Sequence, residues 1–124
     1  MRIVTLPARL AVCRLPPDSP IPPWADAGGE FVATTRTPDE LSIVCGIDVV
    51  PDGIPSEGPW RAFKVQGPLV MTLLGVVAAI ADPLRDAGIS IFAISTYDTD
   101  YVLVHEPDVE AATRALRRAG HDLD

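Results

Sequence analysis

The sequence predicts an α+β fold in which an antiparallel sheet carries its helices on one face. Residues 90–95 and 101–105 form two apolar runs joined by a short polar turn, which indicates a pair of adjacent strands. Amphipathic helix patterns lie immediately before and after this pair. A strand pattern precedes the first helix and a short apolar end follows the second, so the order is βαββαβ. Right-handed crossovers fold such an order into a ferredoxin-like sandwich.

The first half of the chain is predicted to be a shorter version of this arrangement, with strands but only one turn of helix. Strand patterns occur at residues 8–15, 30–36 and 41–45. A proline-rich loop separates the first two, because proline lacks the N–H that a sheet ladder or a helix interior requires. The Thr-Pro-Asp-Glu segment at residues 37–40 fits a capping box, so we expect a helical turn there.

A segment rich in proline and glycine, residues 46–59, is typical of a linker between the two halves. We therefore predict two lobes, an N-terminal lobe at residues 1–59 and a C-terminal domain at residues 60–124. The two lobes either extend one sheet or pack two separate sheets together.

The second half contains the more regular patterns. A strand is expected at residues 60–65, and a helix is expected at residues 70–87. Pro83 conflicts with an unbroken helix, so we expect a kink or an early loosening there. Gly88 is suited to end the helix in the left-handed conformation. The apolar positions at helical spacing are Leu69, Leu73, Val77, Ile80 and Leu84.

The closing helix has clear signals at both ends. It is expected to start at Pro107 or Asp108 and to end at Gly120, and residues 121–124 are left for a short final strand. Arginines near its end suit the negative pole of the helix dipole. Its inner stripe is predicted to consist of Val109, Ala112, Leu116 and Ala119.

Composition and charge limit the classes of partner. The chain has 124 residues, of which 48% are hydrophobic, so a folded core is expected. Ten basic against seventeen acidic residues give a net charge of -7, which disfavours nucleic acid and anionic membrane surfaces as partners. No segment has the pattern of a secretory signal or the length of a membrane span. We therefore expect a cytoplasmic protein.

The two cysteines, Cys13 and Cys45, each lie inside an apolar run. Neither has a second thiol or a histidine at the spacing of a metal site. This favours buried free thiols over a disulfide, and we expect neither a metal nor a cofactor.

Several segments resemble a known family, and residues 90–101, Ser-Ile-Phe-Ala-Ile-Ser-Thr-Tyr-Asp-Thr-Asp-Tyr, carry most of the likeness. Residues 40–44, 60–65 and 75–78 contribute further matches. The chain resembles small bacterial ACT-domain proteins, related to the ligand-binding part of the CASTOR-like cytosolic arginine sensors, from about residue 10 to residue 120. The resemblance implies tandem ACT lobes that bind an amino acid or a similar small molecule between them and carry no catalytic residues.

The resemblance also assigns residues to the binding site. Asp100 would supply negative charge for an ammonium or guanidinium group, and the loop from Pro68 into the first helix would offer main-chain donors to a carboxylate. Two residues of the first half match the position at which the neighbouring lobe contributes its edge to the pocket. The full set is Ser42, Ile43, Gly75, Val76, Thr96, Tyr97 and Asp100.

Simpler roles for these residues stay open. Thr96 and Asp100 equally fit a turn that satisfies its own backbone groups, and Gly75 fits close helix packing. The arginine sensors also contain four ACT units, whereas this chain has at most two. A homodimer would supply the missing lobes and bury exposed sheet edges.

Two other functions are alternatives to a sensor. Residues 64–67 faintly resemble the phosphate loop of acylphosphatases, which would make the protein a small hydrolase. The arginine that follows in that loop is absent, and no nucleophile and base are evident, so we expect no enzyme activity. The remaining alternative is a dimeric interaction module with a vestigial pocket.

Overall fold

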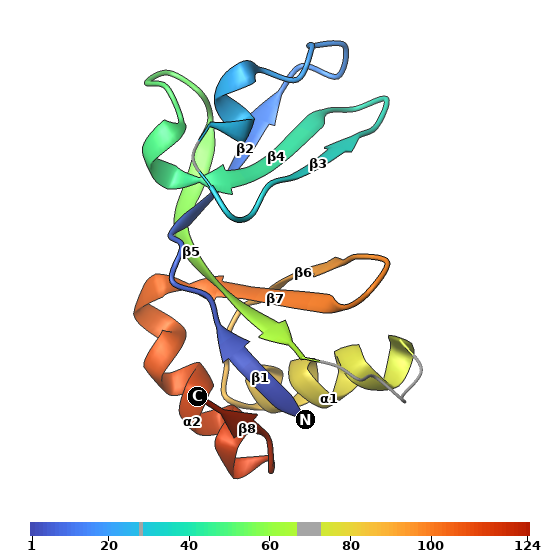
Figure 1. The fold of residues 1–124 in the computed structure, drawn as a ribbon, viewed down its shortest axis with the longest axis vertical. Helices are drawn as coiled ribbons and strands as arrows, with labels where there is room; N and C mark the ends of the chain where they lie inside the picture. Colours follow the sequence, from blue (N-terminus) through green and yellow to red (C-terminus); the bar gives the residue numbers. More distant parts are fainter. Residues whose placement is uncertain (28, 67–72) are drawn as a thin grey trace. The chain divides into compact units, whose positions relative to one another are not determined.

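The computed structural model describes residues 1–27, 29–66 and 73–124. These residues form two compact units, Met1–Pro7 with Arg61–Asp124, and Ala8–Trp60 (Figure 1). We refer to them as the C-terminal unit and the N-terminal unit. The domain limits inferred from the sequence, 1–59 and 60–124, stay a prediction, since the units are defined by contacts alone. No helix among the described residues is long and apolar enough to cross a membrane.

The sheet of the C-terminal unit is built around β5 (Ser56–Val65), whose second half lies in this unit. It pairs with β7 (Asp100–His105), which also pairs with β6 (Phe92–Ser95). On its other side β5 pairs antiparallel with β1 (Arg2–Thr5). The sequence did not predict β1, which is short and pairs with strands more than fifty residues away.

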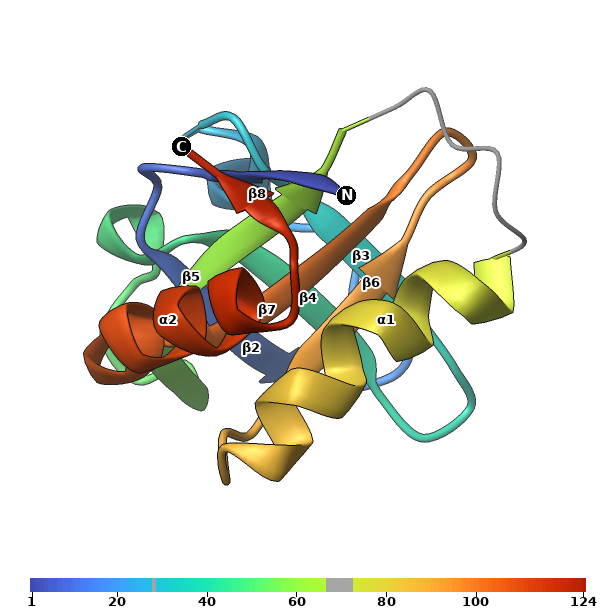
Figure 2. The same cartoon turned by 90° about the horizontal axis from the view of Figure 1, so that it is seen from below.

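Two helices and a short last strand complete this unit. They are α1 (Leu73–Asp86), α2 (Val109–Arg118) and β8 (Asp122–Leu123), and both helices lie on the same side of the sheet (Figure 2). The predicted order βαββαβ and the α+β class are therefore confirmed. One pairing departs from an antiparallel sheet, because β8 runs parallel to β1.

The core of the C-terminal unit lies between the helices and the sheet. Ile80 and Leu84 of α1 and Leu116 of α2 are fully buried against strand residues such as Phe63. The predicted helical stripes are confirmed at these positions. Ala119 is exposed, contrary to the prediction, because it lies at the C-cap beyond the last turn of α2. Leu69 falls outside the described residues.

Both helices end in the same hydrogen-bonded motif. Gly88 (φ 74°) donates its N–H to Arg85 O, and Ile89 donates to Leu84 O. At the end of α2, Gly120 (φ 95°) and His121 make the equivalent pair of bonds to the carbonyls of residues 117 and 116. This is the Schellman arrangement, in which a left-handed glycine lets two N–H groups fold back onto the last turn. The predicted ends at both glycines are confirmed.

Helix α1 continues through Pro83 to Asp86, so the early loosening expected there is absent. Proline has no N–H to donate to the carbonyl four residues earlier, which is that of Ala79. The imidazole of His121 takes the place of the missing donor, because its Nε2 lies 2.8 Å from Ala79 O. Its other ring nitrogen, Nδ1, lies 3.2 Å from the Met1 nitrogen. The residue that follows the end of α2 thus bonds to the carbonyl in α1 that Pro83 leaves without a main-chain donor.

The N-terminal unit contains a smaller sheet in the order β3, β4, β2, β5. Its strands are β2 (Leu10–Leu15), β3 (Ala33–Arg36), β4 (Leu41–Gly46) and the first half of β5. Two short 3-10 helices, η1 (Pro23–Asp26) and η2 (Ile47–Val49), complete the unit, and a third, η3 (Glu106–Asp108), precedes α2.

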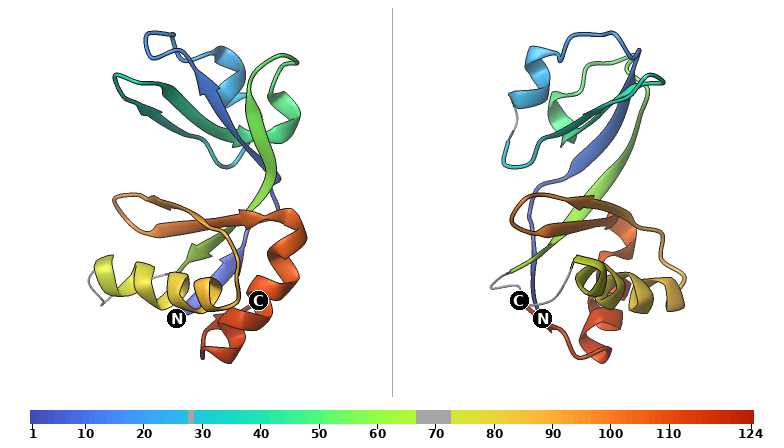
Figure 3. Two further views of the ribbon diagram at one scale, coloured as in Figure 1. Left: turned by 180° about the vertical axis from the view of Figure 1, so that it is seen from behind. Right: turned by 90° about the vertical axis from the view of Figure 1, so that its right-hand side faces the viewer.

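Two sequence expectations fail in this unit. β5 begins at Ser56, inside the segment expected to be a linker. Residues 37–40 form a turn between β3 and β4 rather than a helical turn (Figure 3). The Thr37 hydroxyl accepts hydrogen bonds from the N–H groups of Asp39 and Glu40, each at 3.2 Å. These bonds are the ones an N-cap makes, but here Thr37 N–H also donates to Glu40 O, which closes a hairpin.

Candidate functional site

The polar turn between β6 and β7 is held together by two threonines. Thr96 donates its N–H to Thr99 O at 2.8 Å and its hydroxyl to the same oxygen at 3.0 Å. Thr99 N–H donates back to Thr96 Oγ1 at 3.3 Å. The amide and hydroxyl of Thr96 are therefore used within the turn, and Tyr97 at its tip is fully exposed. This local bonding agrees with the simpler role of Thr96 as a turn former.

The end of the turn is attached to the neighbouring strand. The Thr99 hydroxyl donates to the main-chain carbonyl of Val65 in β5, at 2.5 Å. Asp100 follows as the first residue of β7 and lies opposite Ser95 of β6. Because both sides of the turn are bonded, the position of Asp100 is set by the sheet and not by a loose loop.

Asp100 is the one buried polar or charged side chain among the described residues, with 2% of its surface exposed. Neither oxygen of its carboxylate has a hydrogen-bond partner in the described part of the chain. Burial of a charged group without a partner is costly, because the group loses its hydration and gains nothing in return. A cation that reached this carboxylate would recover that cost, and an ammonium or a guanidinium has the required donors.

The two residues assigned on α1 lie in its first described turns. Gly75 is partly buried, and the side chain of Val76 is 1% exposed and belongs to the core of the C-terminal unit. A contribution of Val76 to a ligand would therefore come from its main chain. The loop from Pro68, expected to supply further main-chain donors, lies outside the described residues.

Ser42 and Ile43 belong to the N-terminal unit, on β4. β4 is not an edge strand of its sheet, because it lies between β2 and β3. The assignment of Ser42 and Ile43 to the pocket stays a prediction. Ser42 is partly buried and pairs with Arg14 on one side and Thr35 on the other. Ile43 is fully buried in the core of its unit, so only Ser42 offers a side chain.

The two cysteines are free and buried in the core of the N-terminal unit, which confirms the prediction. They lie on neighbouring strands, since Cys13 pairs with Ile43 and Cys45 with Ala11. Burial, with a smaller effect of the nearby Cys45, raises the pKa of the Cys13 thiol to about 12. Burial also raises the pKa of Cys45. Neither thiol is therefore poised as a nucleophile. The described residues contain no group of three or more side chains suited to hold a metal ion.

Comparisons with known protein families also divide the chain into two parts, close to the boundary between the N-terminal and C-terminal units. The family model of the ACT domain matches residues 56–118, and a separate N-terminal domain model matches residues 9–53. Over 65 residues the chain is 40% identical to the human protein named cytosolic arginine sensor for mTORC1 subunit 1. That match includes 52% of this chain but only 20% of the sensor's length. A bovine sensor of the same name is 40% identical over 60 residues.

Solved structures show the same fold over nearly the whole chain. A crystal structure from Agrobacterium tumefaciens has 43% sequence identity and a TM-score of 0.93, and the match covers 99% of this chain and 91% of that one. The regulatory subunit of aspartate kinase from Thermus thermophilus has 14% identity and a TM-score of 0.62, with 91% and 93% covered. At such low identity the second likeness concerns the fold alone.

Proposed function

Because the chain belongs to the ACT-domain family, we propose that it binds a free amino acid and acts as a regulatory protein without catalytic activity. The observation that carries this proposal is the buried carboxylate of Asp100, which has no hydrogen-bond partner among the described residues. The name of the human protein that is 40% identical over 65 residues supports the proposal, since that protein is called a cytosolic arginine sensor.

An amino acid offers complementary groups for such a site. Its ammonium, or the guanidinium of an arginine side chain, would bind Asp100, and its carboxylate would accept hydrogen bonds from main-chain N–H groups. In this proposal Gly75, Val76 and Tyr97 contribute main-chain groups. Thr96, whose N–H and hydroxyl already bond to Thr99 O, contributes its main-chain carbonyl. From the N-terminal unit, the resemblance assigns Ser42 and Ile43 to the ligand-binding site.

We also propose that the protein acts in the cytoplasm as a homodimer, with no nucleic acid or membrane as partner. The human relative is named as cytosolic, and this chain matches only 20% of its length. The net charge of -7 disfavours binding to phosphate-rich surfaces. A second copy would increase the number of ACT units in the assembly.

A thermal-shift panel of the common amino acids tests the binding proposal. A ligand at one hundred times its dissociation constant should add about 2.7 kcal/mol to the free energy of unfolding. Asp100→Asn should abolish that shift, because the amide cannot neutralise a cation. Asp98→Asn is the matched control, since Asp98 is exposed in the same turn and should leave the shift intact.

The same experiment separates the alternatives. A vestigial pocket would give no shift with any amino acid or close analogue, and this result would refute the binding proposal. An equal shift in the Asp100→Asn variant would remove Asp100 from the site. Hydrolysis of an acyl phosphate by the purified protein would contradict the absence of catalysis.

A further inference from the structure

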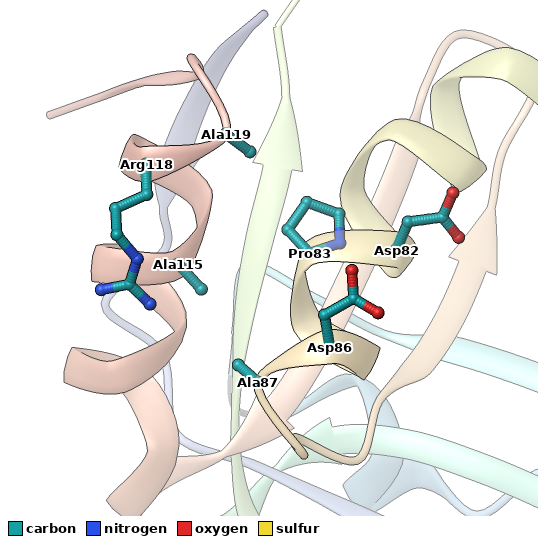
Figure 4. Close-up of a pocket in the computed structure, with 7 residues that line it drawn as sticks. All are labelled: Asp82, Pro83, Asp86, Ala87, Ala115, Arg118 and Ala119. Atoms are coloured by element: carbon teal, nitrogen blue, oxygen red, sulfur yellow. The ribbon is translucent and has the colours of Figure 1, made fainter.

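The C-terminal half of α1 forms a ridge between two grooves. One groove, of about 410 Å³, separates it from the C-terminal half of α2. In Figure 4 the side chains of Asp82 and Asp86 extend from α1, that of Arg118 extends from α2, and small residues such as Ala115 lie between the helices. A second groove, of about 460 Å³, follows the other side of the same segment and includes Asp82 as well.

The charges on the two helices are opposite. On α1, Asp82 and Asp86 share the guanidinium of Arg85, with a separation of 3.3 Å to each, so the ridge keeps one net negative charge. On α2, Arg114 and Arg118 are exposed and four residues apart, which places them on the same side of the helix. Neither arginine makes a hydrogen bond or an ion pair with any other described residue. Glu110 is also exposed and lies four residues before Arg114, so this side of α2 keeps one net positive charge.

A surface with an acidic ridge beside a groove that has a basic wall is complementary to itself. Rotation by 180° about an axis through that surface places the ridge of one copy in the groove of the other. The acidic side chains of each copy then lie against the basic side of α2 in the other copy, so the contact occurs twice. Proline and alanine on the floor of the groove leave room for a helix to approach closely.

We propose that this face, the C-terminal halves of α1 and α2, is where a second copy of the chain docks. The proposal rests on the homodimer of the proposed function and specifies its surface. Asp86 of each copy pairs with Arg118 of the other, and the α1 ridge occupies the groove between the partner's helices. A dimer held in this way weakens as salt is added, because exposed charge pairs are screened.

Charge reversal tests the pairing directly. The mass of the wild-type protein in solution, measured by light scattering or sedimentation, should be that of a dimer. Arg118→Glu and Asp86→Arg should each give monomers, because each change creates two like-charge contacts. An equimolar mixture of the two variants should form a heterodimer, in which one native Asp86–Arg118 pair is kept and the other is replaced by a pair of reversed polarity, glutamate at position 118 with arginine at position 86. Asp52→Arg, an exposed change of the same kind in the N-terminal unit, should remain a dimer.

The mass measurement and the thermal-shift panel test different proposals, dimerisation and amino-acid binding. A monomeric wild-type protein would overturn the proposal, and this is also the result expected if a different protein occupies the groove. A dimer that persists in either single variant, or a mixture that stays monomeric, would overturn it as well. Asp100→Asn should abolish the amino-acid shift without changing the mass, so loss of binding and loss of dimerisation are distinguished by two different measurements.

Discussion

A carboxylate that is 2% exposed and has no described hydrogen-bond partner lowers the stability of the ligand-free protein. We expect Asp100→Asn to raise the free energy of unfolding by about 1–3 kcal/mol, because a neutral amide of the same size loses less on burial. Urea denaturation of the ligand-free protein measures this difference. The same change that abolishes ligand binding should therefore stabilise the free protein.

Asp98→Asn provides the control for that measurement. Asp98 is exposed in the same turn. The free energy of unfolding of the Asp98→Asn variant should therefore equal that of the wild type within error. If Asp100→Asn is instead less stable than the wild type, the Asp100 carboxylate already has a favourable partner within the free protein.

The raised pKa of Cys13 makes stability depend on alkaline pH. The thiol of the unfolded chain ionises near the ordinary pKa of 9.0, whereas the buried thiol ionises at about 12. Between these values the folded state holds a proton that the unfolded state has lost, so stability falls as the pH rises. The slope for one such group is about 1.4 kcal/mol per pH unit.

Urea denaturation at several pH values between 8 and 11 checks this expectation. The variant Cys13→Ala should be less stable overall, because it leaves a cavity, but its stability should fall less steeply with pH. Groups that do not contact Cys13 titrate in the same range, and the comparison of the two slopes removes their contribution. Cys45 is the exception, because its pKa, which burial raises, is lowered in part by a hydrogen bond to Cys13. Equal slopes would show that Cys13 ionises as easily in the folded protein as in the unfolded chain.

At the scale of the elements, α1 and α2 are coupled through Pro83 and His121. His121→Ala should lower the free energy of unfolding by about 1 kcal/mol, because Ala79 O then loses its donor. In a Pro83→Ala background the restored N–H of residue 83 can bond to that carbonyl, so the same change should cost less. A double-mutant cycle by urea denaturation measures the difference.

The double-mutant cycle also cancels the effect of a contact that does not involve Pro83. His121 Nδ1 lies near the Met1 nitrogen, but this contact is lost in both backgrounds and cancels in the comparison. Identical costs in the two backgrounds would contradict the coupling and leave His121 as a residue with local effects only.

Patterns confined to one element were predictable from the sequence. The ends of both helices followed from glycines in the left-handed region, and the buried faces followed from a helical spacing of apolar residues. Features that depend on distant partners were not predictable in the same way. β1 is short and finds its partners in β5 and β8, and Thr37 makes the bonds of a helix cap within a hairpin.

At the candidate site too, local features were predictable from the sequence and features that depend on distant parts of the chain were not. The polar turn before Asp100 was evident from the sequence, and the family resemblance selected Asp100 from its neighbours. Its burial was not evident, because the alternation of a strand does not show which face the rest of the fold covers. The charges on the groove were also missed, since Asp86 and Arg118 lie on different helices and come to line one groove only after folding.

At the scale of the whole molecule, a net charge of -7 in 124 residues means that the folded chain repels itself at low ionic strength. This repulsion acts over longer distances than the pairs on the helical face. Salt therefore has two opposing effects. It should weaken the proposed dimer contacts, and it should relieve the repulsion within each chain.

The free energy of unfolding should rise when NaCl increases from about 10 mM to about 150 mM, because the screening length falls from about 30 Å to about 8 Å. Urea denaturation at each salt concentration measures this slope. A variant with asparagine at four exposed aspartates, Asp18, Asp48, Asp52 and Asp98, has a net charge of -3 and should show a smaller slope. None of these four lines the groove between α1 and α2, so the proposed dimer contacts are the same in both proteins. Equal slopes would show that specific ion pairs, and not the net charge, determine the response of this protein to salt.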